Sequence, residues 1–349
     1  PRQAGRRASR FTKLRIDGSV PYLVGRKSNA APAAASLAAA ARHSSLRRAG
    51  TMEAAAYKRL YPEQYYDKFI AEGARPDGRP LGRARPVSLA RGVVTTAQGS
   101  ALAKVGRTTA IAAVKLEPVA PTLDAPDLGV LEVTVELPPM CSASTRPGRP
   151  SEEAAHATRR IADALEDARV VDLTKLCIKE GLWAWKVSLD VYCLDNDGGA
   201  IDVGLLAAVA ALRDCVVPFA SVDDRGKVHT GGEGKRKRHN RDGPDDANPD
   251  EDENPSSSRC EVTVARVPVA LTVGLYKGQR IVDPSAEETT LMEATVTVVV
   301  DDAGAVVAVV KPGGTAEATE TTLAHCVAAA RLRHSPCVKA MDDAFEGGR

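Results

Sequence analysis

Two regions of the chain alternate between hydrophobic and polar positions and therefore predict strands. In the first region the alternation begins at Val87, and Gln98-Gly99 supplies the turn chemistry of a hairpin. Successive side chains of a strand point to opposite faces, so this alternation indicates sheets with one buried face. The predicted strands cover residues 87–93, 101–105, 108–116, 131–137 and 185–193 in the first region, and 260–265, 267–274, 280–283, 294–300 and 306–310 in the second.

Helical spacing of apolar residues predicts helices between and after these strands. Partial spacing occurs at 57–71, and a clear stripe follows Ser151, which can cap a helix whose first turn is acidic. Further helices are predicted at 202–213, 319–333 and 338–345. Strands precede helices in both regions, and the second half roughly repeats the first. The order therefore predicts an α+β fold of two strand-then-helix halves, with β-sheets packed against helices.

The distribution of charge separates the first 50 residues from the rest. The 349 residues include 47 Lys+Arg and 45 Asp+Glu, a formal net charge of +2. Residues 1–50 hold eleven basic residues and one acidic residue, a local charge of +10 that leaves −8 for the remainder. This Arg-, Ala- and Ser-rich head has the composition of a transit peptide, or it is non-native sequence before a start at Met52.

These changes of composition predict four parts. Residues 1–56 form a disordered basic extension, and residues 226–259 form a disordered charged insert with too few apolar side chains to fold. Residues 57–225 and 260–349 form the first and second halves of the folded protein. Within the insert, Lys235-Arg-Lys-Arg238 is either a nuclear-import patch or part of a solvated loop.

Composition also disfavours several classes of protein. No run reaches the about 18 apolar residues that a membrane span needs, so we expect no membrane contact. The seven cysteines are an odd number without a C-x-x-C pair, which favours reduced core thiols over a disulfide framework or a zinc site. The histidines are scattered, and His156, His325 and His334 are expected on helix surfaces. We therefore expect no metal, no cofactor and no Ser-His-Asp chemistry.

Candidate chemistry lies in an acidic cluster formed by Asp190, Asp195, Asp197 and Asp202. Asp195 and Asp197 are two residues apart at a strand end, so their side chains should leave the same face. Such a pair can act as general acid and base or hold Mg²⁺. The alternative is that Asp195-Asn-Asp-Gly-Gly199 is simply the turn between a strand and a helix.

A basic loop offers a different chemistry. Arg146-Pro-Gly-Arg149 leads into a predicted helix N-terminus, where arginines beside free backbone N–H groups suit phosphate contacts. Two arginines in a loop are a weak signal by themselves.

Several short segments, taken together, resemble the ribonuclease PH family. The resemblance covers about residues 57–345 in order and is broken only by the charged insert. Each segment alone is weak, but their shared order makes the resemblance specific. The segments are Arg75-Pro-Asp-Gly-Arg79, Gly99 to Ile111, Leu137-Pro-Pro-Met-Cys-Ser142, Leu194-Asp-Asn-Asp-Gly-Gly199, Asp283-Pro-Ser-Ala-Glu-Glu288 and Lys311-Pro-Gly-Gly314.

The chain departs from the phosphorolytic members of that family at one turn. In those members a Gly-Ser-Arg or Gly-Thr-Arg segment after the turn Asp binds inorganic phosphate, and the Asp assists catalysis. Asp197 matches that acid, but Gly199 is followed by Ala200 and Ile201. A phosphate would face Asp197 and Asp202 without a compensating cation. We therefore expect a catalytically silent chain with a vestigial Asp197 and no catalytic residue. The alternative is an active phosphate-dependent 3′ to 5′ exoribonuclease that uses Asp197.

The resemblance implies one subunit of an exosome ring in which RNA threads through the channel to a separate nuclease. The implied partners are other ribonuclease PH-type ring subunits, S1/KH cap subunits, the exosome nuclease and RNA. The implied RNA-binding candidates are Arg146 and Arg149, with Lys104 and Arg107 in a hairpin. The implied location is the nucleus, with the nucleolus, and the cytoplasm. A free RNA-binding module is a third interpretation, which the −8 charge of the body disfavours.

Overall fold

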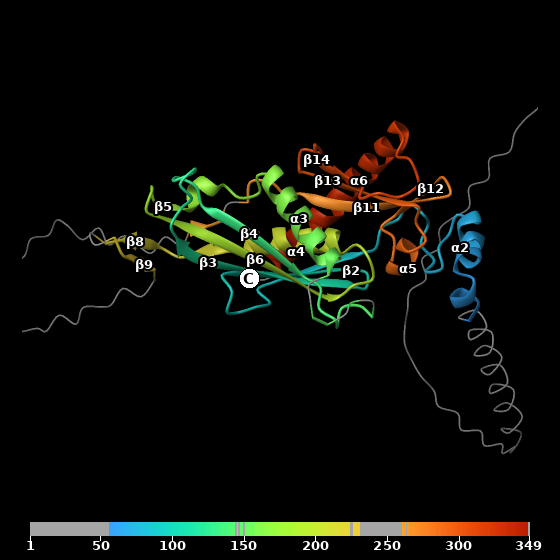
Figure 1. The fold of residues 1–349 in the computed structure, drawn as a ribbon, viewed down its shortest axis with the longest axis horizontal. Helices are drawn as coiled ribbons and strands as arrows, with labels where there is room; N and C mark the ends of the chain where they lie inside the picture. The colour runs from blue at the N-terminus through green and yellow to red at the C-terminus, as the bar shows by residue number, and fades with distance from the viewer. Residues whose placement is uncertain are drawn as a thin grey trace, which may run out of the picture. The chain divides into compact units, whose positions relative to one another are not determined.

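The computed structural model describes residues 56–143, 145, 147–148, 151–223, 226–230, 260–262 and 264–347 (Figure 1). The chain divides after Tyr65 into two compact units, and the sheets belong to the second. Residues 56–60 are helical, and α2 (Pro62–Ala71) follows after a one-residue break, in place of the single helix predicted at 57–71.

The first sheet has the strand order β1-β2-β3-β6-β4, with β5 also paired to β6. Neighbours are antiparallel except β4, which runs parallel to β6. Burial alternates along β3, so one face of this sheet is buried, as the sequence pattern predicts. The strands are β1 (Val87–Arg91), β2 (Gly99–Val105), β3 (Thr108–Val119), β4 (Val130–Glu136), β5 (Cys177–Lys179) and β6 (Trp183–Asp195).

The second sheet has four antiparallel strands in the order β12-β11-β13-β14. There are also two short strand pairs: β7 with β10, which joins the two halves, and β8 with β9, which forms a separate hairpin. The strands are β7 (Val216–Val217), β8 (Ala220–Val222), β9 (Val228–Thr230), β10 (Cys260–Glu261), β11 (Val269–Tyr276), β12 (Gln279–Val282), β13 (Ala294–Val300) and β14 (Val306–Val310).

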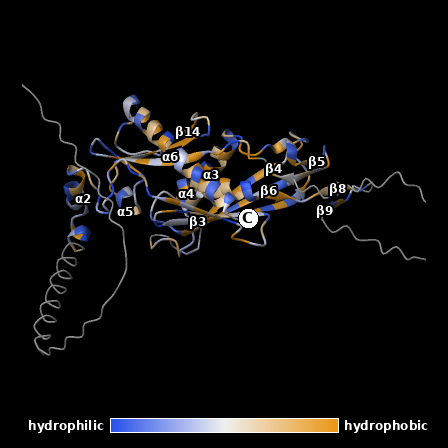
Figure 2. Cartoon of the chain, turned by 180° about the vertical axis from the view of Figure 1, so that it is seen from behind, coloured by the Kyte–Doolittle hydropathy of each residue, from blue (hydrophilic) through white to orange (hydrophobic). Residues whose placement is uncertain are grey.

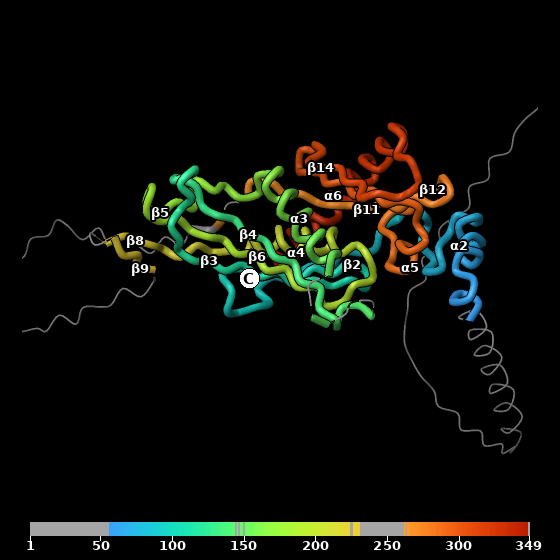
Figure 3. Tube along the Cα trace, viewed as in Figure 1, coloured from blue at the N-terminus to red at the C-terminus, as the bar shows by residue number. Residues whose placement is uncertain are grey.

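Helix α4 (Ala200–Asp214) lies between the two sheets (Figures 1 and 3). All ten residues from Val203 to Leu212 are buried, since α4 contacts β1, β2, β3 and β6 on one side and β11 on the other. A helix that is apolar on every face is stable only when enclosed in this way. The other helical elements are α3 (Glu152–Asp167), the 3₁₀ helix η1 (Leu173–Leu176), α5 (Ala286–Thr289) and α6 (Glu320–Glu346).

One hydrophobic cluster joins both halves of the protein. It contains residues of the first sheet and α4, such as Leu189 and Leu205, together with Ala270, Val299 and Met341 from the second half. Figure 2 shows hydrophobic and hydrophilic residues alternating along strands of the first sheet, in keeping with one buried face. The predicted α+β fold of sheets packed with helices is confirmed.

The structure corrects the prediction of two C-terminal helices. The chain forms one helix, α6, with Pro336 in its interior. Proline removes one helical hydrogen bond and normally ends a helix. Here Pro336 is exposed, whereas Ala330, Cys337 and Met341 are buried on the same helix. Packing on both sides of the proline therefore keeps the helix continuous.

The structure also corrects two boundaries. Val228–Thr230 were predicted to lie in the disordered insert, but they pair with β8, and Trp183 donates its indole N–H to the carbonyl of Gly226 at 2.9 Å. These backbone contacts order residues that bury little apolar surface. The strand predicted at 260–265 is only the two-residue β10. The division into 1–56, 57–225, 226–259 and 260–349 otherwise stays a prediction.

No described helix has the length and apolarity to cross a membrane. Six cysteines in the described part of the chain are free thiols, and five of these are buried: Cys141, Cys193, Cys215, Cys326 and Cys337. Within that part, no group of three His, Cys, Asp or Glu side chains is arranged to hold a metal ion.

Candidate functional site

The candidate site is the turn between β6 and α4, where the sequence places Asp197. Gly198 and Gly199 both adopt left-handed backbone angles, with φ of +85° and +73°. A Cβ on Gly198 would lie 2.8 Å from the backbone of Pro284 and Ala286, so only glycine fits there. No side chain caps α4 at Gly199. The path of the turn therefore requires glycine at position 198 and favours it at position 199.

The side chain of Arg85 anchors this turn through hydrogen bonds. Its guanidinium donates to the carbonyl oxygens of Asp197 and Gly198, each at 2.9 Å. Its Nη2 also lies 2.6 Å from Asp283 Oδ1. Arg85 and Asp283 are only 5% and 3% exposed, so this ion pair is buried. Arg85 therefore connects the turn of the first half to the end of β12 in the second half.

The two partners of this ion pair stabilise each other's charged form. Burial opposes ionisation of Asp283, but the hydrogen bonds and charge of Arg85 outweigh it and hold the pKa of Asp283 below its ordinary value. Burial likewise opposes the charge on Arg85, and Asp283 outweighs it, so the pKa of Arg85 is raised. Both groups are thus held charged by each other.

Thr108 attaches the β2–β3 hairpin to the same turn. Its hydroxyl accepts the backbone N–H of Asp197 at 3.1 Å and donates to the carbonyl of Gly198 at 2.8 Å. Lys104 and Arg107 lie on this hairpin, and both are exposed. The structure thus brings the predicted hairpin candidates and the Asp197 turn into one region.

Asp197 and Asp202 do not face a common space. The Asp197 carboxylate is 27% exposed and lies 4.0 Å from Arg85 Nη1. Asp202 instead accepts the backbone N–H of Thr272 at 2.8 Å and its hydroxyl at 2.9 Å. Burial, with a smaller contribution from the charge of Asp283, raises the pKa of Asp202 to about 6. We predicted that Asp197 and Asp202 would both face a phosphate without a nearby cation. This prediction is wrong, because Asp202 binds Thr272 and Arg85 lies close to Asp197.

The remaining acids of the predicted cluster are also dispersed. Asp190 pairs with Lys115 at 3.1 Å, and both side chains are well exposed. Asp195 is exposed at the end of β6, opposite Thr109. The structure thus gives no shared site for all four aspartates.

Arg146 and Arg149 lie outside the described residues, and so does Lys235–Arg238. The described flanks of the arginine loop can still be placed. The carbonyl of Cys141 accepts the backbone N–H of Asn196 at 2.9 Å, and the Asn196 side chain lies 3.4 Å from Glu153 Oε1. Both flanks of the loop therefore lie beside the Asp197 turn.

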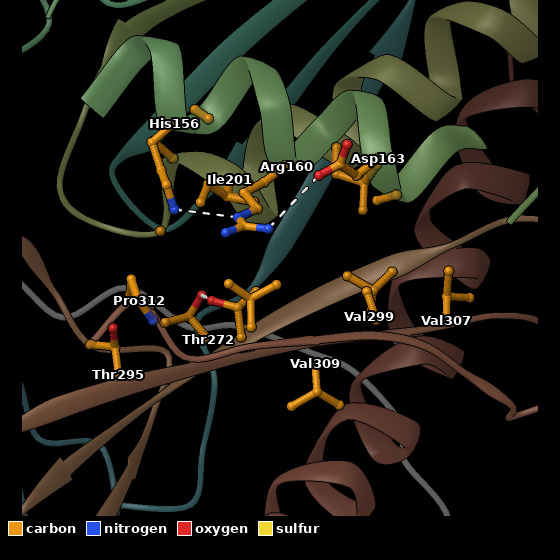
Figure 4. A pocket seen from close by; sticks show the side chains of 18 of the residues that line it. His156, Arg160, Asp163, Ile201, Thr272, Thr295, Val299, Val307, Val309 and Pro312 are labelled. Atoms are coloured by element: carbon orange, nitrogen blue, oxygen red, sulfur yellow. Dashed lines mark hydrogen bonds and ion pairs between the residues drawn. The ribbon is translucent and has the colours of Figure 1, made fainter. Parts of the chain in front are cut away.

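A pocket of about 550 Å³ opens beside the first residues of α4 (Figure 4). The side chains of His156, Arg160 and Asp163, labelled in Figure 4, come from α3, and Arg160 lies between the other two. Facing them are threonine hydroxyls and valines of the second sheet. Ala200 and Ile201 add only apolar side chains to this lining.

Sequence reasoning missed the residues that organise this site: Arg85, Thr108, Thr272 and Asp283. Asp283 falls within a segment that carries the family resemblance, and its φ of +53° marks a special backbone position. Arg85 precedes a strand in a segment with three other arginines, so nothing local distinguishes it from a surface residue. Its role follows from contact with Asp283, 198 positions along the chain.

Comparison with known proteins agrees with the fold. Residues 83–218 match the model of the 3′ exoribonuclease family, domain 1, and residues 266–332 match domain 2. The exosome complex component Rrp42 of Methanopyrus kandleri is 33% identical over 243 residues, which is 69% of this chain and 81% of that protein. Rrp42 of Archaeoglobus fulgidus is 33% identical over 245 residues, 70% of this chain and 82% of that protein.

Solved structures give the same result. A chain of the Archaeoglobus fulgidus exosome with RNA bound to the active site has a TM-score of 0.63 and 30% identity, covering 78% of this chain and 96% of that one. Rice Rrp46 shares the fold at a TM-score of 0.54 and 17% identity, over 77% and 98% of the two chains. The fold is that of ribonuclease PH-like proteins. This chain belongs to the 3′ exoribonuclease family, and the predicted resemblance is confirmed.

Proposed function

We propose that this chain is a non-catalytic subunit of an exosome ring, which supports 3′ to 5′ RNA processing and degradation by shaping the RNA channel. The two Rrp42 relatives named above are exosome components, and this chain aligns with most of the length of each. The observation that carries the non-catalytic part is the start of α4. There, Ala200 and Ile201 offer neither a hydroxyl nor a guanidinium to a phosphate.

The nearby Arg85 does not replace the missing cation. Its nitrogens donate to Asp283, to Thr108 and to two backbone carbonyls, so each has a partner already. A phosphate at the turn would meet the half-buried carboxylate of Asp197 and gain little from a charge that Asp283 neutralises. Electrostatic stabilisation is usually the largest contribution to catalysis at such a site, so its loss disfavours phosphorolysis.

The RNA path would be lined by basic residues of the β2–β3 hairpin and of the arginine loop. Lys104 and Arg107 are exposed on the adjoining hairpin, and Arg146 and Arg149 belong to a loop whose described flanks contact Asn196. The partners would be other ribonuclease PH-type ring subunits, S1/KH cap subunits and the exosome nuclease, in rRNA maturation and mRNA turnover.

We further propose that the protein acts in the nucleus, including the nucleolus, and in the cytoplasm. Three segments favour a ring subunit of the ribosomal RNA-processing protein forty-three type (exosome component eight): Tyr65–Phe69, Thr122–Asp127 and Pro150–Ala154.

The test is a phosphorolysis assay on the purified chain, alone and with a ribonuclease PH-type ring neighbour. Single-stranded RNA is supplied with inorganic phosphate, and release of nucleoside diphosphates is measured. We expect a stable complex with the neighbour and no release attributable to this chain. Release that disappears in Asp197→Asn but persists in Asp190→Asn would establish the alternative, an active exoribonuclease. Recovery of only a monomer would contradict the ring assignment.

A further inference from the structure

A second cavity, of about 660 Å³, lies between the segment 77–87 that leads into β1 and the middle of α6. It shares no lining residue with the pocket of Figure 4. Four arginines line it, whereas only one carboxylate, that of Asp77, does so. The arginines are Arg79, Arg83, Arg85 and Arg333.

Two of these arginines form no ion pair with a described residue. Arg79 pairs with Asp77 at 2.6 Å, and Arg85 pairs with Asp283 at 2.6 Å. The side chains of Arg83 and Arg333 have no hydrogen bond or ion pair within the part of the chain that the structure describes. Like charges around one cavity repel, so this arrangement favours an anion that enters it.

Arg79 supplies a second and independent observation. Its Nε donates to Asp77 Oδ2 at 2.6 Å, and its Nη1 has only carbonyl contacts at 3.4 Å and the Asp283 carboxylate at 3.6 Å. Its Nη2 is buried and has no hydrogen-bond partner among the described residues. Buried donors are nearly always paired, so this nitrogen leaves part of the Arg79 charge at the cavity wall without an acceptor.

We propose that this cavity binds a phosphate group. Guanidinium groups match phosphate oxygens in charge and geometry, and a phosphate has enough oxygens for Arg79, Arg83 and Arg333 together. A carboxylate, with two oxygens, can satisfy fewer of them. The volume is within the range of sites for nucleotide-sized ligands. The phosphate can belong to a free ligand or to an RNA backbone.

The proposal goes beyond the proposed function and does not depend on it. The test uses the full chain at low salt in calorimetric titrations with three probes: inorganic phosphate, a nucleoside monophosphate, and an eight-nucleotide uridine RNA without terminal phosphates. The variant is Arg83→Ala with Arg333→Ala, which breaks no ion pair in the described structure. Arg280→Ala removes an exposed arginine of β12 outside the cavity and is the matched control.

We expect at least one probe to bind, the double variant to weaken it at least tenfold, and Arg280→Ala to leave it unchanged. Thermal unfolding of each variant verifies that it folds. Binding of phosphate or the monophosphate would show that the cavity takes the phosphate of a free ligand. Binding of the RNA alone would show that it takes a phosphodiester of an RNA backbone. No binding by any probe overturns the proposal, as does equal weakening by Arg280→Ala. Binding of an eight-residue glutamate peptide in place of all three probes also overturns it.

Discussion

Arg85 performs a structural task at the place where phosphorolytic relatives are expected to bind phosphate. It is buried, it pairs with Asp283, and it holds the carbonyl oxygens of Asp197 and Gly198. Breaking a buried ion pair by removing one partner leaves an uncompensated charge. The contribution of Arg85 is therefore to the shape of the turn and to the contact between the two halves.

Replacing Arg85 should destabilise the protein strongly. We expect Arg85→Ala to lower the free energy of unfolding by about 3–5 kcal/mol, because Asp283 would stay buried without its partner. The measurement is urea unfolding followed by circular dichroism. Arg159→Ala is the control, since Arg159 forms an exposed ion pair with Asp163 and should lose less than about 1 kcal/mol. Similar small losses in both variants would contradict this role.

Asp202 should make stability depend on pH. Its folded-state pKa of about 6 exceeds its ordinary value of 3.8, so between these values the folded protein holds a proton that the unfolded chain has released. The contribution of Asp202 to the stability of the folded protein is therefore favourable below about pH 4 and is lost as pH rises through about 6. In Asp202→Asn, the amide can accept the Thr272 N–H and donate to the Thr272 hydroxyl, which can turn to Thr297, 2.9 Å away.

We therefore expect Asp202→Asn to raise stability by about 1–2 kcal/mol at pH 7.5 and to change it little at pH 4. Urea unfolding at both values measures this difference. Asp190→Asn, at an exposed ion pair with Lys115, should show no such pH-dependent gain. A gain for Asp202→Asn that is equal at both pH values would exclude titration as its cause.

At the scale of elements, α6 continues through a proline, which normally ends a helix, because both sides of it are packed. The sequence predicts a break near Pro336, and within the helix a proline leaves the carbonyl of Leu332 without its usual partner. Leu332 and Pro336 are both exposed, so water can reach this part of the helix. The buried face, including Cys337 and Met341, continues past the proline.

We expect Pro336→Ala to stabilise the protein by about 1 kcal/mol. Restoring a hydrogen bond and removing the ring clash should gain more than the added freedom of the unfolded chain costs. Thermal unfolding measures this gain, and Ser335→Ala, at the neighbouring exposed position, should change stability by only a few tenths of a kcal/mol. A loss of stability in Pro336→Ala would show that the proline is required.

At the scale of the whole molecule, the sequence predicts the strands and helices better than their contacts. The alternation of β3 and β6 and the apolar run of α4 follow from local patterns, and both are confirmed. The parallel pairing of β4 with β6 and the ion pair of Arg85 with Asp283 join distant parts of the chain. No local period encodes such contacts, so the turn was predicted while the residues that hold it were not.

The shared core predicts that the two halves unfold together. α4 is enclosed by both sheets, and the main cluster joins Leu189 and Leu205 to Ala270 and Met341. Removing either half would expose apolar surface of the other. Both tryptophans, Trp183 and Trp185, lie in β6, so fluorescence reports on the first half, whereas circular dichroism reports on both. We expect the two probes to give coincident urea transitions.

A substitution confined to the second half sharpens this prediction. Val298 is fully buried in β13, in a smaller cluster that contains no residue of the first sheet. Val298→Ala should lower the free energy of unfolding by about 2 kcal/mol because of the cavity that it leaves. The substitution lies outside the first sheet, which holds both tryptophans. If the halves unfold as one unit, the fluorescence transition shifts to lower urea as far as the circular dichroism transition. A fluorescence midpoint that stays in place while circular dichroism shifts would mean that the halves unfold independently, despite the helix enclosed between them.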